Sequence, residues 1–174
     1  SYKLRKAWSS DQRQAFNKQN RQRLHQLQSW WVTEMLNTES PLTENLVLFW
    51  HNHFTSSFHV VKWVPFLYRQ NVLLRQHAAG DFKHLLRSIV SDPAMLFFLD
   101  GRRNHAKKPN ENFAREFFEL FTLGESQGYS EQDIREAARA FSGWVMPPKS
   151  RTAVFNQYET DNQRDITNKI MRIN

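Results

Sequence analysis

Helix start signals recur along the chain, and they constrain its fold more than any other feature of the sequence. Ser40-Pro41 and Asp92-Pro93 each place a capping residue before a proline, an order that favours the first turn of a helix. Ser9 and Gln12 have the spacing of a capping box. With only five Gly and six Pro in 174 residues, the many turns of a β-sandwich are disfavoured.

Apolar residues at helical spacing follow most of these signals. The pattern predicts helices over residues 9–35, 40–54, 64–79, 81–90, 93–99, 110–123 and 130–143, with a loop or short extended stretch over 55–62. We therefore expect an all-α fold, an orthogonal bundle of about six or seven helices, in one domain over residues 1–146. Pro147-Pro148 breaks the chain, and residues 147–174 form a tail with a weak helical stripe at Ile166, Ile170 and Ile173.

Composition narrows the class of protein further. Fourteen Phe and six Trp predict an aromatic core, and a formal net charge of +7 favours anionic partners without identifying one. The absence of Cys excludes disulfides and thiolate metal sites. The longest apolar run, residues 94–99, is too short to span a membrane.

Two stretches combine aromatic side chains with ionisable and amide groups. They are FWHNHF at residues 49–54 and PNENFAREFFELFTLG at residues 109–124. Polar groups among aromatics cost free energy to bury unless they are paired, so both stretches require an explanation. We expect the two helices that carry them to pack against each other at the centre of the bundle.

Five blocks, in the same order, resemble a large bacterial family known as domain of unknown function family 1800. The blocks are SPLTENLVLFWHNHFTSS (40–57), LLRQHAAGDFKHLL (73–86), DPAMLFFLD (92–100), the 109–124 stretch and GYSEQDIREAARAFSGW (128–144). The resemblance covers residues 27–144 and is specific because five ordered blocks contribute to it. Two departures are Asp81, where the family more often has Asn, and the longer turn at residues 125–127.

The resemblance implies a helical protein that is usually longer than this chain and often exported, to the periplasm or the cell exterior. It also implies a protein partner, because family members tend to be encoded beside an uncharacterised protein with a sulfatase-like fold. The family supplies no catalytic residues to carry over.

The first stretch contains the histidines His51 and His53. On a helix they point about 200° apart, so they do not chelate one metal ion together, as a His-x-His pair does on a strand. A metal site would need one of them with carboxylates from another helix. The alternative is structural, with His53 donating to a carbonyl or carboxylate and His51 packing beside Glu44. We favour the structural interpretation and expect no metal or cofactor.

The second stretch places an apolar arc opposite a polar one. Asn110 caps the helix, and Arg115 lies four residues from both Glu111 and Glu119. Glu116 and Glu119, at i and i+3, have the spacing to hold a cation or to act as acid and base. They also fit a solvated face of ion pairs. We favour a third interpretation, a buried polar staple in which Arg115 or the two Glu meet His51 or His53.

The function predicted from these patterns is a non-enzymatic interaction or structural module of an exported protein that acts with a partner protein. One alternative is a metal-dependent or acid/base hydrolase centred on His51 or His53 with Glu116 and Glu119. A second is a nucleic-acid binder that uses the Arg-rich first helix, although no DNA- or RNA-binding motif is present. Phosphate-binding loops, dinucleotide fingerprints and nucleophile elbows are also absent from the sequence.

Overall fold

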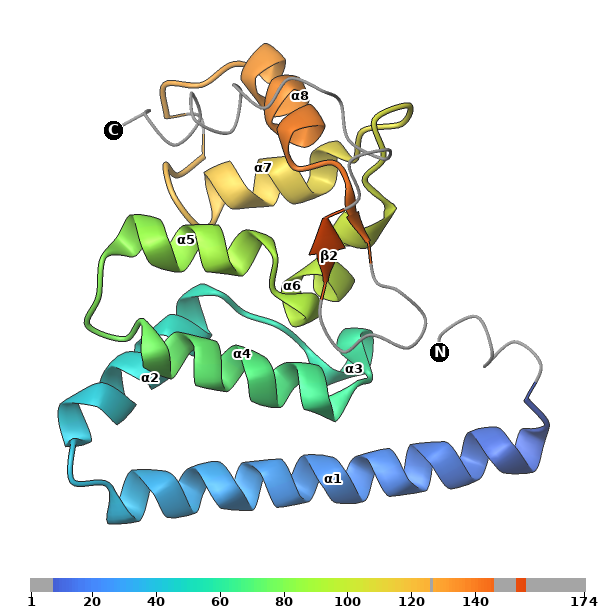
Figure 1. Cartoon of the computed structure of the whole chain (residues 1–174), viewed down its shortest axis with the longest axis vertical. Helices are drawn as coiled ribbons and strands as arrows, with labels where there is room; N and C mark the ends of the chain where they lie inside the picture. Colours follow the sequence, from blue (N-terminus) through green and yellow to red (C-terminus); the bar gives the residue numbers. More distant parts are fainter. Residues whose placement is uncertain (1–7, 126, 146–152, 156–174) are drawn as a thin grey trace.

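The all-α prediction is confirmed by the computed structural model, which describes residues 8–125, 127–145 and 153–155 (Figure 1). Within these residues the helices are α1 (Ser10–Asn37), α2 (Pro41–His53), α3 (Phe58–Val61), α4 (Val64–Gln76), α5 (Phe82–Val90), α6 (Pro93–Phe98), the 3₁₀ helix η2 (Gly101–Arg103), α7 (Glu111–Glu119) and α8 (Glu131–Ala140). Seven of these correspond to the seven expected ranges. No helix in this part of the chain is long and apolar enough to cross a membrane.

Two local features differ from the prediction. The segment expected as a loop over residues 55–62 contains the one-turn helix α3, because the Ser57 hydroxyl accepts a hydrogen bond from the His59 amide. Lys62 then ends α3 in the left-handed conformation, with φ of 57°. In addition, β1 (Trp144–Val145) pairs antiparallel with β2 (Val154–Phe155). The Pro147-Pro148 break and the stripe from Ile166 to Ile173 lie outside the described residues.

The predicted capping residues begin their helices as expected, except that Ser40, at the start of α2, makes no side-chain capping hydrogen bond. Ser9 with Gln12 opens α1 and Ser130 with Asp133 opens α8, each as a reciprocal capping box. Asn110 caps α7 through its side chain, which accepts from the Asn112 amide. These contacts satisfy amide groups that have no partner within the helix, so the helix starts are defined by local chemistry.

The main hydrophobic core lies between α2, α4, α5, α6, α7 and α8. Phe141, at the end of α8, packs edge-on against two phenylalanines of α7, with ring centroids 5.5 Å from Phe113 and 5.0 Å from Phe117. Phe54, after the last turn of α2, is 5.2 Å from the Phe121 ring. The two aromatic stretches therefore meet in one core, through Phe54 and Phe121.

Helix α1 is the outermost element and runs along one side of the molecule (Figure 1). Of its 28 residues only Asn20 is buried. One face of α1 contacts the rest of the fold through ring pairs, with Phe16 at 5.6 Å from Trp63 and Trp30 at 5.1 Å from Tyr68. This helix is therefore attached along a single narrow face.

Candidate functional site

A buried carboxylate of α2 forms the centre of the most extensive polar network described. Glu44 stands in the first turn of α2, and its side chain is only 7% exposed. Arg75 of α4 binds both of its oxygens, with Nε 2.6 Å from Oε1 and Nη2 2.9 Å from Oε2. This two-point geometry fixes the orientation of both side chains and is stronger than a single contact.

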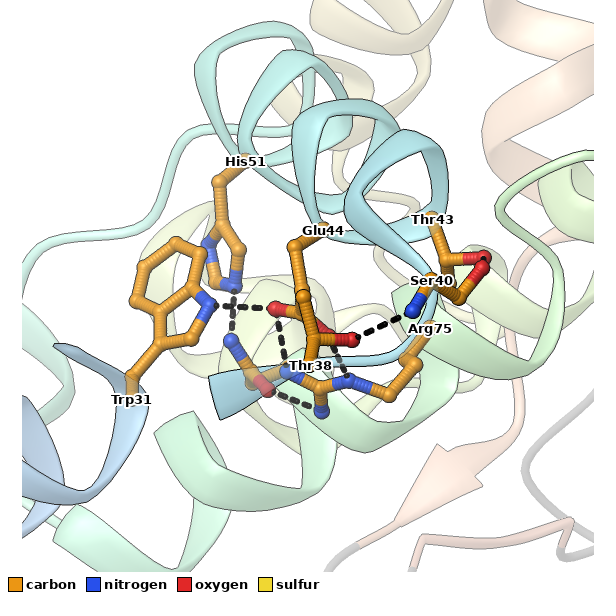
Figure 2. Close-up of polar contacts among 8 residues, drawn as sticks. Trp31, Thr38, Ser40, Thr43, Glu44, His51 and Arg75 are labelled. Carbon is orange, nitrogen blue, oxygen red and sulfur yellow. Dashed lines mark hydrogen bonds and ion pairs between the residues drawn. The ribbon is translucent and has the colours of Figure 1, made fainter. Parts of the chain in front are cut away.

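Three further side chains complete this network, the Glu44–Arg75 cluster, which consists of Trp31, Glu44, His51, Asn71 and Arg75 (Figure 2). The Trp31 indole of α1 donates to Glu44 Oε2 at 3.0 Å. Arg75 Nη1 donates to Asn71 Oδ1 at 2.6 Å, and Asn71 Nδ2 lies 3.1 Å from His51 Nε2. Because the amide nitrogen donates, His51 Nε2 accepts. The cluster thus joins α1, α2 and α4.

The electrostatics of the cluster favour a charged pair beside a neutral histidine. The Arg75 guanidinium and the Trp31 indole lower the pKa of Glu44 against the opposing effect of burial. Burial and the nearby positive charge of Arg75 lower the pKa of His51 from 6.5 to about 4. His51 is therefore uncharged at neutral pH, which is the form that accepts the Asn71 hydrogen bond.

His53, the other predicted histidine, connects the two aromatic stretches. Its Nε2 lies 3.0 Å from the Phe121 carbonyl oxygen, so this nitrogen carries the proton and donates. That contact matches the structural interpretation of His53 as a donor to a carbonyl. His51 and His53 thus both contact their partners through Nε2, which accepts in His51 and donates in His53.

The charged residues of α7 make other contacts than the expected staple. Arg115 donates to both oxygens of Glu131 in the first turn of α8, at 2.8 Å and 2.7 Å, and lies 3.5 Å from Glu119. It therefore ties α7 to α8 instead of meeting His51 or His53. The remaining candidates of this stretch, Asn110, Glu111 and Glu116, are partly buried. The Asn110 side chain donates to the Asp100 carbonyl at 3.0 Å.

The sequence did not predict that four members of this cluster would come together, namely Trp31, Glu44, Asn71 and Arg75. A single signal pointed to Glu44, because it lies three residues before the fully buried Val47 and so shares the apolar face of α2. A carboxylate on such a face needs a partner. The identity of that partner depends on how α4 packs against α2.

A second polar chain lies at the start of α6. Asp92 caps that helix, and its Oδ2 accepts from the Met95 amide at 2.9 Å and from Gln70 Nε2 at 3.2 Å. Ser56 donates to Gln70 Oε1 at 2.5 Å. Burial outweighs the backbone hydrogen bonds and raises the pKa of Asp92 to about 7.

A serine–histidine contact also occurs, between α4 and α5. Ser88 Oγ lies 3.2 Å from His77 Nε2, but the Ser88 hydroxyl donates to the His84 carbonyl at 3.0 Å. Ser88 Oγ therefore accepts from His77, the reverse of the contact that activates a nucleophile. Across the described ranges, no three His, Asp or Glu side chains are grouped closely enough to hold a metal ion.

Comparisons with known proteins place the chain by family alone. No curated protein and no solved structure matches it. A family model described as "Protein of unknown function (DUF1800)" matches residues 1–170, which extends beyond the predicted range of 27–144 at both ends. Because this match spans nearly the whole sequence, the chain belongs to the DUF1800 family of proteins of unknown function.

Proposed function

We propose that this chain is a non-enzymatic helical interaction module that acts with a partner protein. The observation that carries the proposal is the closed state of the Glu44–Arg75 cluster. Both Glu44 oxygens and all three Arg75 nitrogens have partners inside the cluster. A group whose hydrogen bonds are used within the fold serves to position helices and does not present an activated acid, base or nucleophile to a substrate.

An exposed aromatic patch supplies a surface for such a partner. We define this patch as Phe49, Trp50, His53 and Phe82. Phe49 is 55% exposed and Phe82 is 41% exposed, whereas Trp50 and His53 are partly buried between them. The Trp50 ring is 4.8 Å from Phe49 and 5.6 Å from Phe82. Aromatic side chains of this kind are enriched at protein interfaces.

Hydrogen bonds to the backbone hold the centre of the aromatic patch in place. The Trp50 indole donates to the Ala78 carbonyl at 2.8 Å, and His53 donates to the Phe121 carbonyl at 3.0 Å. Side chains fixed before binding lose less conformational entropy when a partner covers them. The patch is thus suited to recognition of another protein.

The hydrolase alternative has weaker support. It requires His51 or His53 to face Glu116 and Glu119 across an open space. His51 instead contacts Asn71, and His53 contacts the Phe121 backbone. Glu119 lies beside Arg115. Elemental analysis of the native protein by plasma mass spectrometry tests this alternative, since one equivalent of a transition metal would favour the hydrolase.

Binding to the sulfatase-like protein that the family resemblance implies as a neighbour tests the proposal directly. The two proteins are co-expressed, and complex formation is measured by co-purification and calorimetry. We expect the wild type to bind. The double variant Phe49→Glu with Phe82→Glu should bind with an affinity at least about tenfold lower, because the buried aromatic area is lost. Val60→Glu, at an exposed site on α3, is the control. A patch variant that binds as the wild type does would overturn the use of this surface, and no binding by the wild type would overturn this partner.

A further inference from the structure

The outer face of α1 differs from the face that attaches this helix to the fold. We define the outer face as Lys18, Arg21, His25, Val32 and Leu36, all of which are exposed. At 100° per residue they fall within an arc of about 60° on the helix surface. The attaching residues, including Phe16, Asn20 and Trp31, centre on the opposite side. The outer face therefore runs along the helix as one continuous strip.

The C-terminal part of this strip is apolar. Val32 is 49% exposed and Leu36 is 79% exposed, and the two lie one turn apart. On the opposite side of the same turns, Trp30 and Trp31 pack against Tyr68 and His51. A helix segment that is apolar on both sides is normally covered on both sides. Here the described structure covers one side only.

The N-terminal part of the strip is cationic. Lys18 and Arg21 make no ion pair with any carboxylate of the described residues, and His25 follows one turn later. Asp11 lies on the same side, nearer the start of α1, and limits the cationic stretch to Lys18 and Arg21. Glu34 belongs to the attaching side, where it interacts with Arg75. The strip therefore has a positive half and an apolar half.

We propose that the outer face of α1 binds an acidic amphipathic helix of a partner protein, an inference that rests on the proposed interaction function. A helix that places carboxylates opposite Lys18 and Arg21, and apolar residues opposite Val32 and Leu36, complements both halves at once. Spacings of three, four and seven residues along the strip match the packing of two helices side by side. At 1.5 Å per residue, the 28 residues of α1 offer a contact line of about 42 Å. Figure 1 shows α1 at the edge of the molecule.

Charge distinguishes this partner from two other occupants. A second copy of the chain in parallel register would place Lys18 and Arg21 opposite themselves, and an antiparallel copy would place them against Val32 and Leu36. The first arrangement is repulsive and the second buries charges against apolar groups. A nucleic acid would use the cations and leave Val32 and Leu36 in water. An acidic helix satisfies all of these side chains.

Two synthetic helical peptides of the length of α1 test the proposal by fluorescence anisotropy. The acidic peptide has Glu opposite the cationic half and Leu opposite the apolar half, and the basic peptide has Lys in place of each Glu. We expect the acidic peptide to bind the intact chain and the basic peptide to bind about tenfold or more weakly. Binding of the acidic peptide should be about tenfold weaker for the double variant Lys18→Glu with Arg21→Glu. It should also be about tenfold weaker for the single variant Leu36→Glu.

Lys83→Glu, at an exposed site on α5, and Leu120→Glu, at an exposed site directly after α7, are the matched controls and should bind the acidic peptide as the wild type does. Equal binding of both peptides, or undiminished binding by Leu36→Glu, would overturn the inference. A dimer in sedimentation that Leu36→Glu abolishes would also overturn it, because the occupant would then be a second copy of the chain. Binding of oligo(U) that depends on Lys18 and Arg21 but not on Leu36 would overturn it as well. A further outcome is that the neighbour protein binds through Phe49 and Phe82 with an affinity that the α1 variants leave unchanged. That result would overturn this inference and leave the proposed function intact.

Discussion

Arg75 of α4 donates hydrogen bonds to both carboxylate oxygens of Glu44 in α2, at 2.6 Å and 2.9 Å. The same arginine lies 5.3 Å from the centre of the Trp30 ring of α1. The guanidinium of this α4 residue therefore contacts groups from both α1 and α2. Arg75 is thus one of the residues that attach α1, a helix in which only Asn20 is buried.

Arg75→Ala should destabilise the fold by about 3 kcal/mol, because it leaves the Glu44 carboxylate buried without its counter-charge. Chemical denaturation at neutral pH measures the free energy of unfolding. Arg87→Ala is the matched control, since Arg87 is exposed on α5 and should change stability by less than about 0.5 kcal/mol. Similar values for the two variants would show that Glu44 is solvated and that the cluster does not hold the helices.

Removing both charges separates the ion pair from the shape of the site. The double variant Glu44→Gln with Arg75→Met should lose less stability than Arg75→Ala alone, because no unpaired charge remains. The coupling free energy from Glu44→Gln, Arg75→Met and the double variant measures the interaction of the pair directly. A double variant less stable than either single one would contradict this explanation.

The pKa of His51, lowered to about 4 by burial and by Arg75, predicts a loss of stability in acid. Below about pH 6.5 the unfolded chain binds a proton at this position that the folded chain does not bind, so stability falls as pH decreases from about 6.5 to 4. The difference amounts to about 3 kcal/mol. His51→Gln keeps an acceptor for Asn71 and does not titrate, so its unfolding free energy should lack this component. Parallel pH profiles for the wild type and the variant would contradict the assignment.

Asp92 predicts the opposite pH dependence. Burial raises its pKa to about 7, so the folded state holds a proton that the unfolded state has released, and this stability is lost as pH rises from about 4 through 7. Asp92→Asn keeps the acceptor for the Met95 amide and should be more stable than the wild type at pH 8 by at least about 1 kcal/mol. The control is Asp81→Asn at the exposed cap of α5, where hydrogen bonding from the His84 amide lowers the pKa. That variant should lose stability at pH 8, and the same sign for both would contradict the prediction.

Helix positions were predictable from the sequence because their signals are local. The boxes that begin at Ser9 and Ser130 lie within four residues of the amides they cap, so no tertiary contact is needed to recognise them. Helix α3 was missed because its cap, Ser57, opens a single turn, which is too short to show a helical period. The pairing of β1 with β2 involves two residues on each strand and has no detectable alternation.

The composition of the Glu44–Arg75 cluster was not predictable, since it depends on tertiary packing. Glu44 and Arg75 are 31 residues apart, and several other cations of the chain were equally available from the sequence. Arg115 illustrates the same limit, because two local carboxylates are within reach on α7, yet its shortest contacts are to Glu131 of α8. Local spacing identifies which groups need partners, and helix packing decides which partners they obtain.

Close packing around Gly101 gives a final test of the core. A Cβ at this position would lie 2.9 Å from Leu96 Cδ2 and 3.2 Å from Phe113 Cδ2, both of which belong to fully buried side chains. Gly101→Ala should therefore destabilise the fold by about 1–3 kcal/mol through overpacking. Gly80→Ala is the control, because its nearest neighbour would be the His77 carbonyl at an ordinary 3.5 Å, and it should be neutral or stabilising by about 0.5 kcal/mol. Leu96→Val removes the δ-methyl in closest contact, so the double variant with Gly101→Ala should be more stable than the sum of the two single effects predicts. Strict additivity in urea denaturation would show that the strain lies elsewhere, since relief of the Leu96 contact is the only source of coupling in this explanation.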